Sequence, residues 1–214
     1  MLIAIEGLPG SGKSTQSRIL RQALESTGNA VYLPDNRTRA ATPLGTALLE
    51  LFATDDPFAR HESVITTTML AAAIRAETYA NDIAPALDTG ATVIEDRGLH
   101  TMYSYSLATL LQDHRADPTP AIAWLTASAA WSGSAAEISI WLRLPPDESI
   151  TRAEARGRRT YTREQRAYLH HVHDAYTALA DHDPSLIPLD AAGLGPAEIH
   201  RSVLSLAATH MHKP

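Results

Sequence analysis

The chain opens with MLIAIEGLPGSGKST, residues 1–15, and this stretch decides the fold. Residues 2–6 form a short apolar run that predicts a buried β-strand, and residues 7–15 match the phosphate-loop pattern G-x-x-x-x-G-K-[ST] without a gap. A helix is expected from about residue 13 to residue 26. The glycines let successive backbone N–H groups point inward at a phosphate, and the positive end of the helix dipole adds to that field. The stretch therefore predicts a nucleotide-binding α/β domain.

The loop also predicts the chemistry of the donor site. Lys13 is expected to bridge the β- and γ-phosphates of ATP, and the hydroxyl of Ser14 is expected to bind Mg²⁺. Of the 18 basic residues only Lys13 and Lys213 are lysines, which indicates that the loop needs a compact ammonium rather than a guanidinium fork. The predicted ATP-binding residues in the loop are Gly7, Gly10, Ser11, Gly12, Lys13, Ser14 and Thr15.

Beyond the loop, apolar runs and helical patterns alternate along one domain of 214 residues. Alternating strands and helices favour a parallel sheet covered on both faces, a three-layer α/β/α fold. Ligands bind such sheets beyond the carboxyl ends of the strands. Further strands are expected at 30–34, 92–95, 138–144 and 186–189, and helices at 43–87 with a break near 55–57, from about 146, at 162–181 and at 196–209.

Composition excludes several classes of protein. The net charge of −6 disfavours general binding to nucleic acid or to a membrane surface, and the absence of cysteine excludes disulfides and thiolate metal sites. No run of about 18 apolar residues appears, so no membrane span is expected. Residues 1–5 are expected to be a strand rather than a signal peptide, and a cytoplasmic protein is expected. The ten histidines lack zinc-site spacing, and Trp124, Trp131 and Trp141 are expected to pack in the core.

Two carboxylates and an arginine follow the predicted strand at 92–95. Side chains alternate along a strand, so Glu95 and Asp96 should point to opposite faces. Asp96 is the predicted carboxylate for the Mg²⁺ shell, reached through water, and Arg97 is expected to bind the acceptor group or the transferred phosphoryl. An ordinary surface salt bridge at a strand end is the alternative.

Arginines are crowded between residues 152 and 163, which predicts a lid at about 152–164. Arg152 and Arg156 share a helix face, and Gly157 permits a break into a loop that closes over the transferring phosphate. Arg156 and Arg159 are the predicted catalytic residues of this lid. The alternative is a solvated basic helix paired with Glu148, Glu154 and Glu164. The five arginines are Arg152, Arg156, Arg158, Arg159 and Arg163.

These motifs occur in an order and approximate spacing that resembles the thymidylate kinases, over nearly the whole chain. The middle segments discriminate most, because phosphate loops occur in many families. The matching segments are 6–15, 42–45, Arg75, 85–87 with Gly90, Asp96-Arg97, the lid arginines, Tyr176 and 189–191.

The resemblance implies a five-stranded parallel core, ATP as donor, Mg²⁺ as cofactor and a nucleotide acceptor held beside Arg75 and Arg97. It also implies that Arg152 lies near the adenine and that Asp190 belongs to the adenine loop. Family members are often homodimers, with the long middle helices at the interface. Arg37 and Tyr105 are the further acceptor-side residues that the resemblance suggests.

The acceptor side departs from the family pattern. Pro9 replaces an acidic residue of the loop, Gly98 replaces a tyrosine, Ser106 replaces the glutamine expected near Tyr105, and Thr78 replaces a histidine. These departures leave the use of ATP better supported than thymidylate specificity. A nucleoside monophosphate, which the resemblance implies, is the first predicted acceptor, and its anionic phosphate needs no base. A second hypothesis is a hydroxyl-directed kinase for a nucleoside or an aminoglycoside-like metabolite, with Asp35 as base. A third is a non-catalytic nucleotide-binding module.

Overall fold

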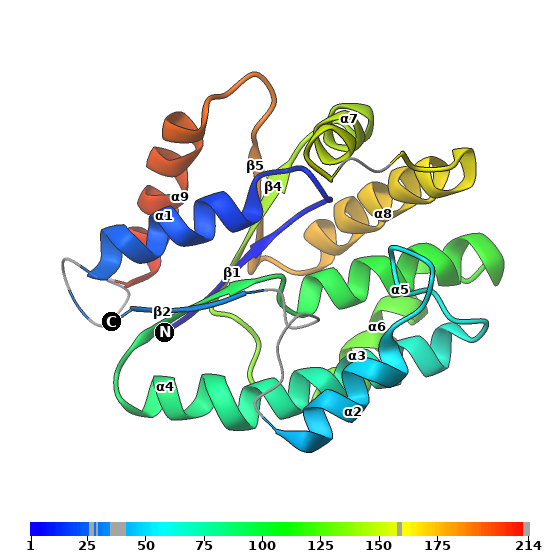
Figure 1. Cartoon of the computed structure of the whole chain (residues 1–214), viewed down its shortest axis with the longest axis horizontal. Helices are drawn as coiled ribbons and strands as arrows, with labels where there is room; N and C mark the ends of the chain where they lie inside the picture. Colours follow the sequence, from blue (N-terminus) through cyan, green and yellow to red (C-terminus); the bar gives the residue numbers. More distant parts are fainter. Residues whose placement is uncertain (26–27, 29, 35–41, 158–159, 212–214) are drawn as a thin grey trace.

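Five parallel strands form the centre of the protein, as a computed structural model of the chain shows (Figure 1). The structure describes residues 1–25, 28, 30–34, 42–157 and 160–211. The strand order is β2-β3-β1-β4-β5, which confirms the predicted five-stranded parallel sheet. The strands are β1 (Leu2–Glu6), β2 (Ala30–Leu33), β3 (Thr92–Asp96), β4 (Ile138–Arg143) and β5 (Leu186–Asp190).

Helices cover both faces of the sheet, so the predicted three-layer arrangement is confirmed (Figure 1). On one face α1 (Lys13–Glu25) and α9 (Pro196–Met211) pack together, and Leu20 and Val203 meet the strand residue Ile5 in one buried cluster. On the other face lie α4 (Ala84–Asp88), α5 (Leu99–Asp113), α6 (Pro118–Ala129) and α8 (Arg163–His182). The apolar stripe of each helix thus faces the sheet or its neighbours.

The long helical region between β2 and β3 is interrupted twice. α2 (Pro43–Phe52) and α3 (Val64–Thr78) begin at side-chain caps, Thr42 and Ser63, whose hydroxyls accept backbone N–H groups of the first turn. Residues 53–63 connect them, so the predicted break is confirmed. A π-helical turn, η2 (Tyr79–Ile83), then leads into α4.

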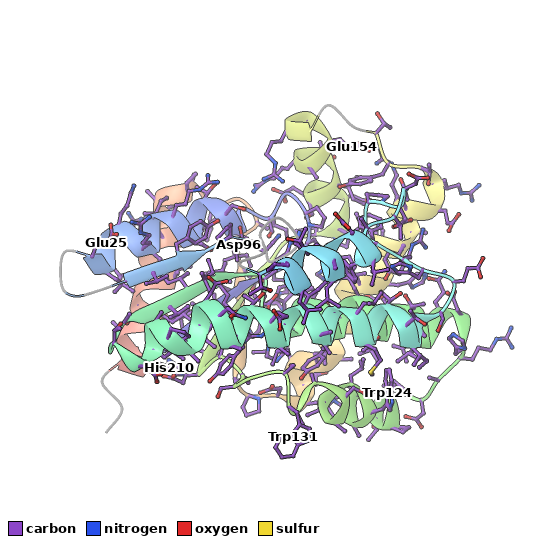
Figure 2. All side chains as sticks on the ribbon, turned by 60° about the horizontal axis from the view of Figure 1, so that its bottom comes forward. Glu25, Asp96, Trp124, Trp131, Glu154 and His210 are labelled. Atoms are coloured by element: carbon purple, nitrogen blue, oxygen red, sulfur yellow. The ribbon has the colours of Figure 1, made fainter. Side chains whose placement is uncertain are left out.

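The sequence prediction omitted α5 and α6, and it misplaced one tryptophan. Trp141 is buried and Trp124 packs against a buried cluster, but Trp131 follows α6 and is 96% exposed. Figure 2 shows Trp131 projecting away from the ribbon. Its assignment to the core was wrong because it lies in a turn beyond the end of a helix, where no second element covers it. In the described part of the chain no helix has the length and apolarity to cross a bilayer.

Candidate active site

The phosphate loop connects β1 to α1 at the carboxyl edge of the sheet. Gly10 has a φ of +87°, and a Cβ added there would lie 2.3 Å from the backbone oxygen of Ser149. Glycine is therefore required both by the backbone conformation and by the close approach of α7 (Pro146–Gly157). The hydroxyl of Ser149 donates to the backbone oxygen of Pro9 over 2.6 Å, so α7 is hydrogen-bonded directly to the loop.

Lys13 is folded over the loop rather than extended into solvent. Its side chain is buried, and Nζ donates to the backbone oxygen of Leu8 at 2.7 Å and to Oγ of Ser11 at 3.4 Å. Ser14 is half-buried and Thr15 is exposed at the start of α1. The ammonium thus lies within the turn whose amides are expected to bind phosphate, and a ligand would exchange its contacts with those two oxygens.

The carboxylates that end β3 are both buried and have different partners. Glu95 Oε1 lies 3.1 Å from Nη1 of Arg75 on α3, whereas Asp96 Oδ2 accepts from the hydroxyl of Tyr32 on β2 at 3.4 Å. A surface salt bridge was the alternative interpretation of this segment, and the burial of both carboxylates contradicts it. Figure 2 shows Asp96 near the centre of the molecule, where the sheet ends.

The buried carboxyl of Glu95 has both a positive and a negative neighbour, Arg75 and Glu6. Burial raises the pKa of this carboxyl to about 7, Arg75 opposes the rise, and the nearby Glu6 adds to it. Oε2 of Glu95 and Nε of Arg75 have no hydrogen-bond partner among the described residues. Buried polar atoms without partners are costly, and Arg75 lines a cavity, so its Nε fits a site that a polar ligand completes.

A cavity beside these residues brings together most of the predicted acceptor-binding side chains. Arg75, Arg97 and Tyr105 all line it, and so does Ser106, whose hydroxyl accepts a hydrogen bond from Thr68 at 2.8 Å. Arg37 lies outside the described residues. The remaining wall is mainly apolar and is formed by Phe52, Phe58, Val64, Ala71, Ile74, Leu99 and Met102.

One wall of the cavity is an aromatic cluster that sequence reasoning missed. Phe58 packs against Tyr105 and Tyr168 with ring centroids 6.0 and 5.5 Å apart, and the guanidinium of Arg60 lies 4.6 Å from the centroid of the Tyr168 ring. The carboxylate of Asp56 fixes this arrangement, because it accepts from the Phe58 amide at 2.7 Å and pairs with Arg60. Asp56 was visible in the sequence only as part of a helix break.

Comparison with known proteins matches this architecture to one family. The thymidylate kinase family model matches residues 5–203. The chain belongs to the thymidylate kinase family.

Individual thymidylate kinases resemble the chain along nearly their full length. The thymidylate kinase of Synechococcus sp. strain JA-2-3B'a(2-13) is 34% identical over 200 residues, which cover 93% of this chain and 90% of that protein. Those of Pseudomonas fluorescens strain Pf-5 and of Symbiobacterium thermophilum are each 30% identical, with 96% of this chain covered and 94% and 92% of those proteins. The predicted enzyme class, an ATP-dependent nucleotide kinase, is therefore confirmed.

The segment predicted to be a lid, at about 152–164, is described only in part. Arg152 is exposed and pairs with Glu148 at 2.5 Å, and Arg156 and Arg163 are exposed. The predicted catalytic residue Arg159 and its neighbour Arg158 lie outside the described residues, as does Asp35. Of the acidic residues expected to pair with this segment, Glu154 and Glu164 pair instead with arginines outside it, Arg166 and Arg60.

The predicted adenine-loop residue lies at the end of β5. Asp190 is exposed, and its carboxylate pairs with Arg143 of β4 at 2.5 Å. This hydrogen bond lowers the pKa of Asp190. Asp190 is thus held beside the carboxyl end of the strand next to β1, on the donor side of the sheet edge.

Proposed function

We propose that the protein transfers the γ-phosphate of ATP to a nucleoside monophosphate, with thymidylate as the first acceptor, giving ADP and a nucleoside diphosphate. The observation that carries this proposal is the adjacency of the two sites. β1 and β3 are neighbouring parallel strands with Ile5 opposite Asp96, so the phosphate loop and Arg97 leave the same edge of the sheet side by side. The family's name supports thymidylate as the acceptor.

On the donor side, the phosphates of ATP would bind to the loop between Gly7 and Thr15, with Lys13 between the β- and γ-phosphates. Arg152 and Asp190 are the proposed contacts for the adenine end. The same loop amides hold the triphosphate in line with the acceptor, so positioning supplies much of the rate.

Ser14 and Asp96 are the proposed residues for Mg²⁺. Oδ1 of Asp96 is buried without a hydrogen-bond partner among the described residues, which fits an oxygen reserved for a cation or its water. The described residues contain no cluster of three metal-binding side chains. Mg²⁺ commonly uses few protein ligands and completes its shell with phosphate oxygens and water. When bound, it would neutralise charge on the β- and γ-phosphates.

The proposed transfer needs no protein base. An oxygen of the acceptor phosphate forms a bond to the γ-phosphorus, the bond between that phosphorus and the β,γ-bridging oxygen breaks, and ADP leaves with the electron pair. Arg97 on the acceptor side, with Arg156 and Arg159 from the lid, is proposed to stabilise the charge on the transferring group. Arg75, Tyr105 and Arg37 are the proposed acceptor contacts.

The acceptor is tested by ADP release from ATP and Mg²⁺ with a panel of substrates. The panel contains the thymidine, deoxyuridine, deoxycytidine and deoxyguanosine monophosphates, thymidine itself and an aminoglycoside. We expect turnover with thymidine monophosphate and little with thymidine. Turnover with the hydroxyl acceptors alone would overturn the proposal in favour of a hydroxyl-directed kinase. Asp35→Asn then separates the two chemistries, because only a hydroxyl acceptor requires a carboxylate to take up its proton.

We also propose that the protein forms a homodimer through α2 and α3. Leu44 and Leu51 are seven residues apart on α2, and Ile65 and Met69 are four apart on α3, so each pair lies on one helix face. All four side chains are exposed by 41% or more, and α2 packs against α3. Two adjacent apolar stripes on packed helices are typical of a helical interface. The proposed compartment is the cytoplasm, which supplies ATP and nucleotides.

A further inference from the structure

Glu6, the last residue of β1, is a buried carboxylate that collects hydrogen bonds from two other elements. Oε1 accepts from the backbone N–H of Gly98 at 3.0 Å. Oε2 accepts from the hydroxyl of Thr101 at 2.5 Å and from the hydroxyl of Tyr176 at 3.1 Å. The residue has no exposed surface, so these donors replace the water that a carboxylate would otherwise bind.

The first of these hydrogen bonds stabilises a strained turn at the proposed acceptor site. Arg97 has a φ of +79°, a left-handed conformation that is strained for a residue with a side chain. Its N–H donates to the backbone oxygen of Ile5 at 3.1 Å, and the next N–H, that of Gly98, donates to Glu6. The end of β1 therefore holds the turn from which the Arg97 side chain extends.

Gly98 is required for this contact. A Cβ at Gly98 would lie 2.9 Å from the Cβ of Ala4 and 3.2 Å from Oε1 of Glu6. Any side chain would push the turn away from β1 and lengthen the hydrogen bond to Glu6.

Tyr176 extends the same network to the phosphate loop. Its hydroxyl donates to Glu6 and accepts from the backbone N–H of Gly7, the first residue of the loop, at 3.3 Å. The ring is stacked on Trp141 of β4 with centroids 5.3 Å apart and planes 14° apart. Burial and the nearby Glu6 raise the pKa of the Tyr176 hydroxyl well above its ordinary value, so it stays protonated.

We infer that Glu6 is a positioning residue for both halves of the transfer, through Gly98 for the Arg97 turn and through Tyr176 for the phosphate loop. This inference rests on the proposed function, which assigns the loop to ATP and Arg97 to the acceptor. Because one carboxylate holds both the Arg97 turn and the phosphate loop, the distance between these two groups is set by the last residue of β1. Such fixing matters because a displacement of about 1 Å at a reacting group can cost about 100-fold in rate.

Glu6→Gln and Tyr176→Phe test the two connections. Glutamine keeps the shape but offers one acceptor oxygen, and its NH₂ must face a donor that Glu6 accepted. We expect kcat to fall roughly 10- to 100-fold with the fold retained. Tyr176→Phe keeps the stacking on Trp141 and removes the hydroxyl that joins Glu6 to Gly7. Glu6 keeps its hydrogen bonds from Gly98 and Thr101 in this variant, so we expect the KM and Kd of ATP to rise by about 3- to 10-fold while the KM of the acceptor changes less.

Tyr103→Phe is the matched control, because it removes the hydroxyl of another buried tyrosine, one that is not among the donors described to Glu6. It should keep wild-type constants. Equal increases in both KM values for Tyr176→Phe, or an unchanged kcat in Glu6→Gln, would overturn the inference. A loss of activity that matches the loss of folded protein, measured by thermal unfolding, would overturn it as well. If Glu6→Gln does not fold, the inference is tested by the Kd of ATP for Tyr176→Phe, measured by calorimetry.

That calorimetric measurement needs no acceptor, so it separates this inference from the proposed function. A wild-type protein that binds ATP but releases no ADP with any monophosphate refutes the proposed acceptor and leaves the loop link measurable. An unchanged ATP Kd in Tyr176→Phe refutes the link whatever the acceptor is.

Discussion

At the scale of single residues, the donor site depends on where the ammonium of Lys13 lies before ATP binds. Nζ is held by backbone and side-chain oxygens of the loop itself, Leu8 and Ser11. These contacts hold the ammonium within the turn, and a bound phosphate is proposed to replace them. The site is thus preorganised for an anion by the same residues that the motif specifies.

Lys13→Ala should therefore abolish most of the activity. We expect kcat to fall by about 100-fold or more, since a charge that contacts the transferring group is lost, and Lys13→Arg should restore little because a guanidinium has a different shape. ADP release with saturating acceptor measures the effect. Lys213→Ala, which removes the chain's only other lysine, is the charge-matched control. Full activity in Lys13→Ala would show that the donor site lies elsewhere.

Glu95 makes stability depend on pH. Its pKa is about 7 in the folded protein against an ordinary 4.5, so between these pH values the folded state keeps a proton that the unfolded state has released. The free energy of unfolding must then fall as pH rises through this window, by about 3 kcal/mol in total. The difference in unfolding free energy between wild type and Glu95→Gln, measured in urea from pH 5 to 8, should show this decline. A difference that stays constant with pH would contradict it.

Sequence patterns predict the position of the loop between β1 and α1, because its residues are consecutive and their spacing is itself the motif. Sequence patterns do not predict Phe58, Arg60 and Tyr168, which line the cavity beside Arg75 and come from a helix connection and from α8. No local pattern marks a residue whose partner is 100 positions away. The burial of Glu95 against Arg75 was also invisible, because a carboxylate at a strand end has the same sequence signature whether it is exposed or covered.

At the scale of elements, α5 connects the cavity, which it helps to line, to the end of β1, where the phosphate loop begins. The position of its first turn is fixed by His100. Nδ1 of His100 is 3.0 Å from Oγ of Ser139 on β4, and Nε2 is 3.0 Å from Oδ2 of Asp183, beyond the end of α8. The sequence did not predict α5, because its buried face mixes apolar side chains with His100, Ser104 and Ser106. A clean 3.6-residue apolar stripe, the usual helix signal, is absent there.

His100→Ala should destabilise the protein by about 2 to 4 kcal/mol, because it leaves the buried hydroxyl of Ser139 without this partner and opens a cavity. The pKa of Asp183 is lowered chiefly by its hydrogen bond with His100. The contribution of this pair to the free energy of unfolding is therefore fully present above the ordinary aspartate pKa and is lost as pH falls. Urea unfolding at pH 7 measures the change. His171→Ala, at an exposed position of α8, should stay within about 0.5 kcal/mol of wild type. Equal stability of the two variants would show that the contacts of His100 with Ser139 and Asp183 do not stabilise the fold.

At the scale of the whole molecule, the alternation of strands and helices was enough to predict a parallel sheet covered on both faces. It was not enough to predict the order β2-β3-β1-β4-β5, since that order depends on which strands pair across the sheet. Placing β1 in the centre brings the phosphate loop between the ends of β3 and β4. The residues proposed to bind donor and acceptor thus meet because of a topology that spacing along the chain does not encode.

The exposed stripes on α2 and α3 lead to the last prediction, which concerns the assembled protein. Leu51→Glu combined with Met69→Glu places two carboxylates on the proposed interface, and burying unpaired charges there costs several kcal/mol. We expect the wild type to sediment as a dimer at micromolar concentration and the double variant as a monomer with an unchanged fold by circular dichroism. Trp131→Glu, which alters an exposed aromatic residue in the turn after α6 and on neither of the two helices, should remain dimeric. A monomeric wild type, or a double variant that still dimerises, would show that these apolar stripes are not the interface.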